Sequence, residues 1–190
     1  RQRQMCIRDR NYKYSIAVSG THGKTTTTSM LSYILIDADT DPTISVGGIL
    51  DSIGGNIRVG KSEYFVTEAC EYTNSYHAFK PFISIILNVD ADHLDFFKDI
   101  DEIAESFHVF ATKTPKEGLV IVNGDMKYYD TVVRDLECRI VTFGKGTQNK
   151  YSAHNIRFDD LGHPTYTLVV DGKEVTDITL RVFGEHNVYN

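Results

Sequence analysis

The sequence predicts an α/β fold: a mostly parallel sheet flanked by helices, with a small antiparallel β-sheet near the C-terminal end. Short apolar segments that are typical of buried strands alternate with helical patterns as far as residue 143. The segment 82–89 is almost continuously apolar, as expected of a central parallel strand covered on both faces. From residue 151, three partly alternating segments are separated by turns, and Asp171-Gly172 between two of them is a strong hairpin signal.

The composition is that of one globular domain. The 190 residues are enough for one sizeable core, and 41% hydrophobic with 24% charged residues is an ordinary balance. A formal net charge of −6 argues against nucleic acid and anionic membranes as partners. The sequence has no apolar segment of membrane-spanning length, no signal-peptide pattern, and no cysteine spacing typical of zinc sites or disulfide frameworks. We therefore expect a cytoplasmic protein.

A glycine-bounded loop follows the first apolar strand. The strand at 16–18 stops at this loop, and apolar residues at 30, 31, 34 and 35 then recur at the spacing of a helix over about 24–36. Such a loop directs backbone N–H groups into a concavity at a helix N-terminus, where partial positive charge favours phosphate. The sequence therefore predicts a P-loop-type sheet whose nucleotide-binding residues are Gly20, Thr21, His22, Gly23, Lys24, Thr25 and Thr26.

Lys24 and Thr25 carry the chemistry expected of this loop. Lys24 would place a point charge near the β- and γ-phosphates of a nucleotide, and the Thr25 hydroxyl would bind Mg²⁺. The loop has only two residues between its glycines, whereas the common phosphate loop has four. The alternative is a glycine turn before a threonine-rich helix, but Gly-Lys-Thr after a buried strand seldom lacks a phosphate.

A second strand, at 64–67, ends in two glutamates, Glu68 and Glu71. A carboxylate just past the C-terminal end of a buried strand lies where ligands bind in an open α/β sheet. Glu71 would complete a Mg²⁺ site with Thr25 and phosphate oxygens, because Mg²⁺ takes few protein oxygens and several waters. By itself the segment is more typical of a solvated acidic loop, and Glu68 is close enough in sequence to be the ligand instead.

The strand at 82–89 leads directly into a polar cluster that contains His93. This histidine is accompanied by three carboxylates at 90, 92 and 95, beside the end of a buried strand. The cluster is the second strong signal of a ligand site at this edge of the sheet. Taken alone, His93 would be a surface or capping histidine.

The remaining segments continue the alternation. A strand at 43–46 precedes Gly47 and Gly48, which are more typical of a turn than of close approach to a ligand. We expect a hairpin or loop at 51–60, a helix at 99–112, a strand at 118–122, a turn at 123–125, an irregular helix at 126–136 and a strand at 139–143. Asn123 and Asp125 are interpreted as a capped turn, with a nucleotide contact as the alternative.

The motifs resemble those of the Mur ligase family and occur in that family's order. The short loop at 20–28 resembles the family's ATP loop, residues 88–95 resemble its Asn-x-x-x-Asp-His-x-Asp element, and residues 184–190 resemble its Gly-x-His-Asn-x-x-Asn element. The resemblance assigns residues 11–190 to the central, ATP-binding domain, truncated at its C-terminal end. Residues 1–10 are interpreted as a non-native or disordered tail, with a native interdomain linker as the alternative.

The resemblance also implies roles for individual residues. Lys24, Glu71 and His93 are implied to be catalytic, with Thr25, Glu71 and His93 as metal ligands, and Glu71 matches the family's glutamate better than Glu68. His93 would hold a second Mg²⁺, and Asp92 and Asp95 would orient its ring or bound waters. Asn187 and Asn190 would contact adenine through their amides. Several family members carry a carbamoylated lysine on the helix at 99–112; none lies between Lys98 and Lys113, and His108, which occupies that neighbourhood, is given no role.

The implied function is ATP- and Mg²⁺-dependent amide formation in bacterial peptidoglycan precursor synthesis. The threonine-rich loop and the Glu-Ala-Cys-Glu-Tyr segment at 68–72 favour the family member that joins L-alanine to UDP-N-acetylmuramate through an acyl phosphate. Flanking domains would hold these two substrates, so the 190-residue chain alone is expected to bind Mg-ATP weakly and to ligate nothing. The alternatives are a muramyl-tripeptide recycling ligase and a non-catalytic nucleotide-binding module.

Overall fold

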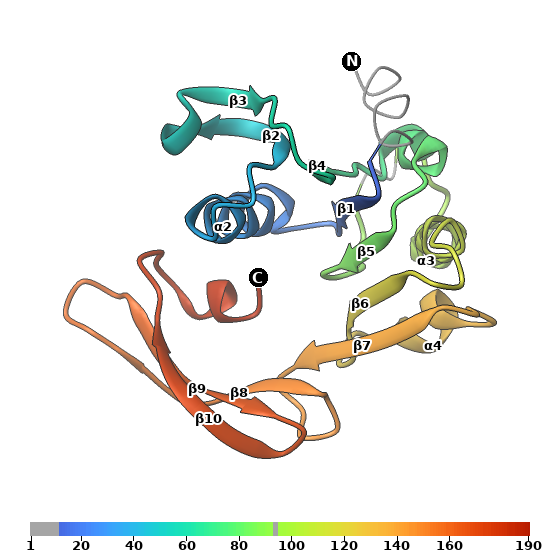
Figure 1. Cartoon of the computed structure of the whole chain (residues 1–190). Coiled ribbons are helices and arrows are strands. Elements are labelled where there is room, and N and C mark those ends of the chain that lie inside the picture. The colour runs from blue at the N-terminus through green and yellow to red at the C-terminus, as the bar shows by residue number, and fades with distance from the viewer. Residues whose placement is uncertain (1–11, 93–94) are drawn as a thin grey trace.

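The computed structural model describes residues 12–92 and 95–190 and places ten strands of this part in one sheet, in the order β10-β9-β8-β7-β6-β5-β1-β4-β2-β3 (Figure 1). The strands are β1 (Tyr14–Ser19), β2 (Thr43–Leu50), β3 (Gly55–Arg58), β4 (Tyr64–Glu68), β5 (Ile83–Ile86), β6 (Leu119–Asn123), β7 (Arg139–Gly144), β8 (Tyr151–Phe158), β9 (Pro164–Val170) and β10 (Lys173–Thr179). The helices are α2 (Lys24–Asp37), α3 (Ile100–Ala111) and α4 (Tyr129–Val133), with short 3₁₀ helices η1 (Asp51–Ile53), η2 (Tyr72–Ala78) and η3 (Glu185–Val188). The expected tail at 1–10 lies outside the described residues.

The middle of the sheet is parallel, as the sequence predicts. Strand β1 lies between β4 and β5 and pairs with both in parallel, with Ile16 opposite Val66 on one side and Ile83 on the other. Strands β6 and β7 continue the parallel order beyond β5, and β2 does so beyond β4. The C-terminal ends of β1, β4 and β5 therefore meet at one edge, and the segments that follow these three strands share that edge.

Helix α3 covers one side of the sheet and holds the main core. Its residues Ile103, Phe107 and Phe110 are at most 1% exposed, and Phe110 stacks on Tyr76 of η2 with ring centroids 4.8 Å apart. The side chain of Asp99 caps the helix by accepting a hydrogen bond from the Glu102 N–H at 3.0 Å. The helix expected over 99–112 is thus confirmed, and its apolar spacing does face the core.

Helix α2 lies on the opposite side of the sheet, against β2 and β4 (Figure 1). Its buried residues are small and polar, namely Thr27, Thr28 and Ser32. The apolar residues that predict this helix are less buried, and Ile34 is 64% exposed. Short side chains facing the sheet allow the helix to pack closely, so the apolar residues of α2 border a cavity instead of forming the core.

The three C-terminal strands form the expected antiparallel arrangement, but they extend the main sheet rather than packing on it. Strand β8 pairs with β7 in parallel through only two residue pairs, and β9 and β10 then add antiparallel. Because so few pairs join β8 to β7, the three strands bend away from the parallel part (Figure 1). Asp171 and Gly172, with φ angles of 49° and 75°, form the predicted turn between β9 and β10.

Two boundaries differ from the sequence prediction. Strand β2 runs through Gly47 and Gly48 to Leu50 and pairs with β3 as a hairpin, so the two glycines lie within a strand and not in a turn. Helix α4 has only five residues, Tyr129–Val133, because Arg134 leaves the helical region and Asp135 has a positive φ of 54°. The irregular helix expected at 126–136 is therefore shorter than the pattern suggests.

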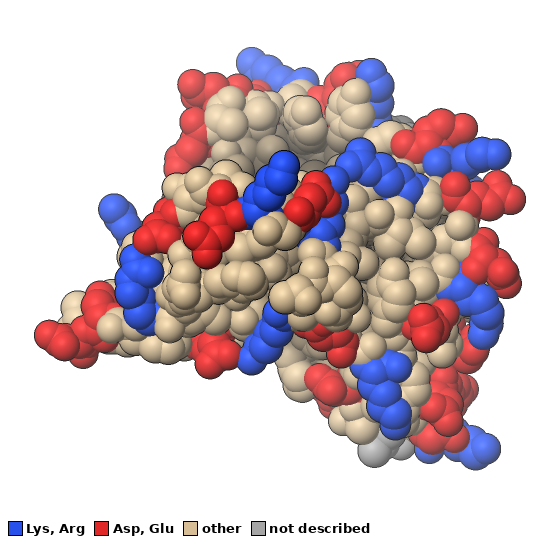
Figure 2. All heavy atoms as spheres, turned by 90° about the horizontal axis from the view of Figure 1, so that it is seen from below, with Lys and Arg blue, Asp and Glu red and all other residues tan. Residues whose placement is uncertain are grey.

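The described surface carries both signs of charge. The face in Figure 2 has Lys and Arg side chains interspersed with Asp and Glu, with uncharged residues between them. Among the helices of the described residues, none combines the length and the apolar character needed to cross a bilayer.

Candidate functional site

The loop between β1 and α2 depends on two glycines. Gly20, with φ of 146°, lies so close to β5 that a Cβ would be 2.9 Å from Leu87 Cβ. Gly23 precedes the first residue of α2 with φ of 86° and ψ of −4°, a left-handed conformation that favours glycine. A Cβ on Gly23 would also overlap the side-chain oxygen of Asn190. Both glycines of the predicted loop are therefore required by backbone geometry.

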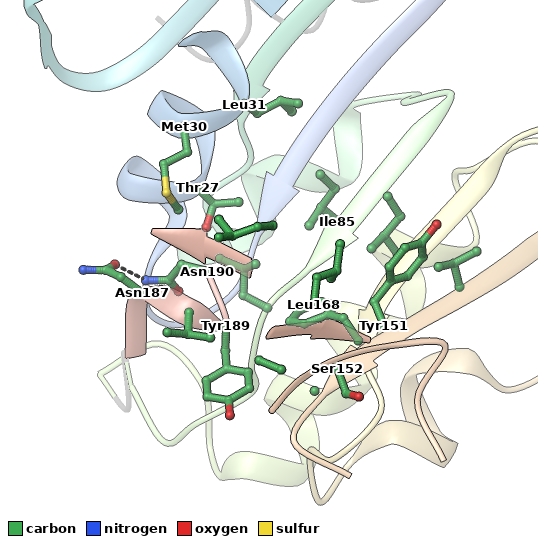
Figure 3. A pocket seen from close by; sticks show the side chains of 18 of the residues that line it. Thr27, Met30, Leu31, Ile85, Tyr151, Ser152, Leu168, Asn187, Tyr189 and Asn190 are labelled. Carbon is green, nitrogen blue, oxygen red and sulfur yellow. Dashed lines mark hydrogen bonds between the residues drawn. The ribbon is translucent and has the colours of Figure 1, made fainter. Parts of the chain in front are cut away.

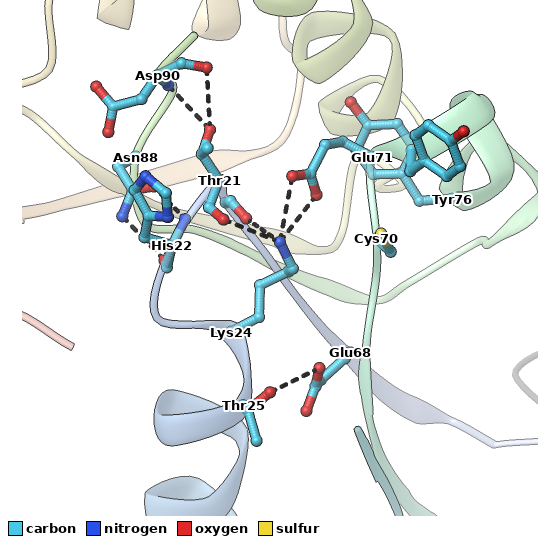
Figure 4. Close-up of polar contacts among 12 residues, drawn as sticks. Thr21, His22, Lys24, Thr25, Glu68, Cys70, Glu71, Tyr76, Asn88 and Asp90 are labelled. Carbon is cyan, nitrogen blue, oxygen red and sulfur yellow. Dashed lines mark hydrogen bonds and ion pairs between the residues drawn. The ribbon is translucent and has the colours of Figure 1, made fainter. Parts of the chain in front are cut away.

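Residues 88–90, which follow β5, form hydrogen bonds with this loop. The sequence did not predict this contact. Asn88 accepts a hydrogen bond from the His22 N–H at 2.8 Å and donates one to the His22 carbonyl at 3.0 Å. The Thr21 hydroxyl accepts from the Asp90 N–H at 2.9 Å, and the Thr21 N–H donates to the Asn88 carbonyl at 3.2 Å. The two strongest sequence signals are thus joined physically (Figure 4).

The first turn of α2 is suited to an anion. The first intrahelical bond runs from the Thr27 N–H to the Gly23 carbonyl, so the N–H groups of Lys24, Thr25 and Thr26 precede it. Within the described residues no side chain caps this end, and the first turn has no acidic residue. The partial positive charge of the helix N-terminus is therefore left for a ligand, as in phosphate-binding loops.

Lys24 turns back onto its own loop and onto Glu71. Its Nζ donates to the Gly20 carbonyl at 2.6 Å and to the Thr21 carbonyl at 3.2 Å. It also lies 3.2 and 3.1 Å from the two carboxylate oxygens of Glu71, which is 2% exposed (Figure 4). Lys24 and Glu71 therefore form an ion pair that is largely removed from solvent.

Thr25 meets the other glutamate. Its hydroxyl donates to Glu68 Oε2 at 3.2 Å, and Glu68 Oε1 accepts from the Gly47 N–H at 2.6 Å. Gly47 leaves room for this carboxylate, since a Cβ there would be 2.8 Å from Glu68 Oε2. The Thr25 hydroxyl thus contacts Glu68, the alternative left open by the sequence, while the predicted Mg²⁺ site of Thr25 and Glu71 stays a prediction. Glu68 makes this contact because it ends β4 beside β2, whereas Glu71 lies three residues further on, at the start of η2.

Only some of the residues expected to hold a second Mg²⁺ or its waters lie within the part of the chain that the structure describes. His93 lies outside the described residues, so its predicted role has no structural counterpart here. The side chain of Asp95 accepts a hydrogen bond from the Tyr72 hydroxyl at 3.1 Å. His108 belongs to α3, and its Nδ1 lies 3.3 Å from the carbonyl oxygen of Val132 on α4. Within residues 12–92 and 95–190, no cluster of three or more His, Cys, Asp or Glu side chains could hold a metal ion.

The C-terminal segment returns to the loop and encloses a cavity of about 690 Å³ with it. Asn187 is 8% exposed, and its amide donates to the Phe183 carbonyl at 2.7 Å and accepts from Asn190 at 2.8 Å. Asn190 lies against Gly23, as noted above. The cavity is bordered by the loop residues His22, Gly23 and Thr26 and, on its far side, by Asp125, Lys145 and Tyr189. The loop after β1 and the C-terminal segment, which lie at opposite ends of the chain, thus line the same cavity.

Asp125 organises the wall of this cavity opposite the loop. Its carboxylate accepts hydrogen bonds from the Lys145 and Gly146 N–H groups and from the Asn149 side chain. Burial by itself would raise the pKa of Asp125, but these hydrogen bonds outweigh it and hold the pKa below its usual value. Asn123 accepts from the Asp125 N–H at 3.0 Å, so the capped turn is present and also borders the cavity.

A second cavity, of about 600 Å³, lies next to the first and is mostly apolar (Figure 3). It extends between α2, the face of β5 to β7 and the bent strands β8 to β10. Met30, Leu31 and Ile34 of α2 line it, which explains why the apolar residues of this helix are not in the core. Tyr189 and Asn190 contribute to both cavities.

Comparison with known proteins matches the motifs to a family. A profile of the Mur ligase middle domain matches residues 18–190. The chain belongs to the Mur ligase family. A protein of Lachnospira eligens named UDP-N-acetylmuramate–L-alanine ligase is 56% identical over 180 residues, which is 94% of this chain and 39% of that protein. The chain thus spans about two fifths of the length of the curated relatives it matches.

Solved Mur ligases have the same fold. MurC from Thermotoga maritima, a UDP-N-acetylmuramate–alanine ligase, superposes with a TM-score of 0.82 at 28% identity, covering 98% of this chain and 41% of that one. A ligase from Neisseria meningitidis that is named for joining UDP-N-acetylmuramate to a tripeptide superposes with a TM-score of 0.86 at 25% identity, covering 99% and 61%. The expected fold class and family membership are therefore confirmed.

Proposed function

We propose that this chain is the ATP-binding part of a bacterial, cytoplasmic ligase that joins L-alanine to UDP-N-acetylmuramate. The observation that carries the proposal is the loop at 20–26, which offers Lys24 and uncapped helix N–H groups to an anion beside Thr25 and Glu68. Relatives named as alanine-adding ligases, 46% to 56% identical to this chain, favour this member of the family. Residues 11–190 act as its central domain, and flanking domains hold the muramyl and amino-acid substrates.

The triphosphate of ATP binds at the N-terminus of α2. The N–H groups of Lys24, Thr25 and Thr26 donate to its oxygens, and the Lys24 ammonium neutralises charge near the β- and γ-phosphates. Because Asn88 holds the His22 backbone from both sides, the loop is arranged before the nucleotide arrives. A preorganised loop loses less conformational entropy on binding.

The oxygens of Thr25 and Glu68 fit Mg²⁺. They are hard donors 3.2 Å apart, they are not fully buried, and they lie beside the proposed triphosphate site. Held there, Mg²⁺ would supply positive charge that stabilises the negative charge developing during phosphoryl transfer. His93 is proposed as a ligand of a second Mg²⁺, as the family resemblance implies. Glu71, whose oxygens contact Lys24, is proposed as the further ligand of the first ion that the family resemblance implies.

The nucleoside part of ATP enters the cavity of about 690 Å³. Asn190 borders this cavity and contacts the loop, so we propose it as the residue that meets adenine. Both ends of the Asn187 amide are used inside the C-terminal segment, and we therefore give Asn187 the role of holding Asn190 in place. The Asp125 network fixes the opposite wall, where Lys145 and Tyr189 lie.

The reaction consists of two transfers. A carboxylate oxygen of UDP-N-acetylmuramate attacks the γ-phosphorus of ATP, the bond from phosphorus to the β–γ bridging oxygen breaks, and ADP leaves. The amine of L-alanine then attacks the acyl carbon, the bond from that carbon to the phosphate oxygen breaks, and phosphate leaves while the amine loses a proton. Lys24 and the loop N–H groups stabilise the negative charge on the transferred group.

Gly23→Ala tests the loop geometry. A side chain at φ of 86° is strained and would overlap Asn190. We expect the affinity of the full-length ligase for ADP to fall roughly 10- to 100-fold, the equivalent of 1–3 kcal/mol of local strain. Isothermal calorimetry measures the effect. Gly55→Ala is the control, since Gly55 has no atom within 4 Å of a Cβ and is expected to bind ADP like the wild type; equal affinity of the two variants would contradict the assignment.

The substrate assignment is tested with the full-length ligase. ADP formation is measured with ATP, Mg²⁺ and UDP-N-acetylmuramate, adding L-alanine, other amino acids or the tripeptide L-alanyl-γ-D-glutamyl-meso-diaminopimelate one at a time. We expect turnover with L-alanine and little with the others. Turnover with the tripeptide alone would identify a recycling ligase, and no turnover with any acceptor would favour a nucleotide-binding module without ligase activity.

A further inference from the structure

Lys145 joins two segments that border the cavity of about 690 Å³. It follows the last residue of β7, whereas Glu185 and Tyr189 belong to the C-terminal segment that carries Asn190. Its Nζ donates a hydrogen bond to Glu185 Oε1 at 2.7 Å and lies 5.0 Å from the centre of the Tyr189 ring. One side chain therefore connects the end of the parallel sheet to the C-terminal segment, at the border of the cavity.

The main chain of Lys145 is held in place by Asp125, which follows β6. The Asp125 carboxylate accepts hydrogen bonds from the Lys145 and Gly146 N–H groups and from the Asn149 amide. A Cβ on Gly144 would overlap this carboxylate, so the close approach requires glycine there. The side chain of Lys145 therefore starts from a fixed point, and less conformational entropy is lost when its ammonium reaches Glu185.

The C-terminal segment is held together by its own hydrogen bonds. The Tyr189 N–H donates to the His186 carbonyl at 3.1 Å, and the Asn187 N–H donates to the Gly184 carbonyl at 3.2 Å. The Asn190 amide donates to Asn187 Oδ1 at 2.8 Å (Figure 3). A contact that holds Glu185 and Tyr189 therefore also holds Asn190, the residue that we propose to meet adenine.

The strength of the Lys145 contact suits a role in binding and not in folding. The side chains of Lys145 and Glu185 are 66% and 50% exposed, and an ion pair that is open to solvent contributes little to stability. The Tyr189 ring adds a second contact for the same ammonium. Together these contacts can fix the position of one short segment, whereas the core does not depend on them.

We propose that Lys145 is a positioning residue for the nucleoside part of ATP: through Glu185 and Tyr189 it holds the C-terminal segment so that Asn190 borders the cavity. The inference rests on the proposed function, in which this cavity receives the nucleoside. A nucleotide that enters a cavity whose wall is already in place orders fewer residues, so it binds more tightly. The contact supports binding of ATP and leaves the transfer of its γ-phosphate unchanged.

ADP binding to the full-length ligase distinguishes this role from a simple effect of charge. ADP is an anion, so Lys145 as a point charge would attract it and Glu185 would repel it. Charge alone therefore predicts that Lys145→Met weakens ADP binding and that Glu185→Gln strengthens it. The positioning role predicts that both weaken it: we expect Kd to rise about fivefold in Lys145→Met and about threefold in Glu185→Gln, which keeps the aromatic contact. Isothermal calorimetry measures both.

Three further variants complete the comparison. The double variant of Lys145→Met and Glu185→Gln is expected to raise Kd about fivefold and not about 15-fold, because the first substitution already removes the shared contact. Lys145→Arg keeps the charge and the aromatic contact and is expected to bind ADP within about twofold of wild type. Lys127→Met is the matched control: Lys127 is exposed and lies 5.1 Å from the centre of the Tyr128 ring, outside the cavity lining.

Kinetics provide a second readout. In Lys145→Met we expect the KM for ATP to rise about fivefold, with kcat within about twofold of wild type and an unchanged melting temperature. Unchanged or tighter ADP binding in Glu185→Gln would overturn the positioning role, and so would an equal loss of affinity in Lys127→Met. A lowered kcat with an unchanged KM would overturn it as well, because the contact would then act on the transfer step.

The two proposals fail in different ways. If the wild-type ligase joins no substrate while the two single substitutions still weaken ADP binding without adding, the proposed function fails and the positioning role of Lys145 stands. If the wild type turns over with L-alanine and the two effects on ADP binding are additive, only the positioning role fails.

Discussion

Lys24→Ala is expected to lower kcat/KM of the full-length ligase for ATP roughly 1,000-fold, because the substitution removes the side-chain cation nearest the transferred phosphate. The ammonium lies 2.6 Å from the Gly20 carbonyl, inside the loop that we propose as the triphosphate site. Alanine also removes the ion pair between Lys24 and the buried Glu71 carboxylate. Steady-state kinetics with UDP-N-acetylmuramate and L-alanine measure the loss.

Lys98→Ala is the control for this experiment. Lys98 is 88% exposed and precedes α3, away from the loop, so its removal is expected to leave kcat/KM within about twofold. Circular dichroism at the assay temperature shows whether Lys24→Ala is folded. A folded Lys24→Ala enzyme with wild-type kinetics would contradict the proposed role of the loop.

Phe110→Ala is expected to destabilise the protein by about 3–5 kcal/mol, the usual cost of removing a buried aromatic ring from a core. Phe110 is fully buried on α3, and its ring stacks on Tyr76 at 4.8 Å. The core that it fills also supports the segment carrying Glu71. Urea unfolding of the full-length ligase, followed by near-ultraviolet circular dichroism, measures the change in the free energy of unfolding.

Val109→Ala on the same helix is the matched control. Val109 is 37% exposed, so its truncation removes little buried surface and is expected to cost less than about 1 kcal/mol. If both variants lost equal stability, the core would not lie where α3 meets η2.

The loop and the parallel sheet were predictable because their signals are local. The glycines of the loop, Lys24 and Thr25 are contiguous, and their spacing between a strand and a helix sets their geometry almost alone. Helix α3 was equally clear, since its apolar residues at 103, 107 and 110 face one core. The hairpin between β9 and β10 followed from two residues, Asp171 and Gly172, that favour positive φ.

The partners of the loop were not predictable, because they come from distant segments. The pattern predicted a strand from 82 to 89, yet β5 ends at Ile86. The segment after it leaves the sheet and hydrogen-bonds to His22 and Thr21. The periodic spacing of apolar residues predicts a helix, but it does not show whether those residues pack in a core or line a cavity. Helix α2 was therefore predicted, whereas the cavity that its apolar residues line was not.

The contacts of Glu68 and Glu71 show the same limit. The two glutamates are three residues apart in the sequence, and this spacing does not show which of them contacts Thr25. The deciding feature is Gly47. Its missing side chain leaves room for the Glu68 carboxylate, and its N–H donates a hydrogen bond to that carboxylate. Gly47 was interpreted from the sequence as a turn residue, because the sequence does not show that Glu68 of the neighbouring strand lies beside it.

The central claim is that this loop transfers the γ-phosphoryl group of ATP to a carboxylate, and isotope transfer tests it most directly. The full-length ligase is given UDP-N-acetylmuramate with both carboxylate oxygens labelled as ¹⁸O, together with ATP, Mg²⁺ and L-alanine. The account predicts one ¹⁸O atom in each inorganic phosphate released and the other in the new amide, because the attacking oxygen leaves with phosphorus. Unlabelled phosphate accompanying amide formation would contradict it.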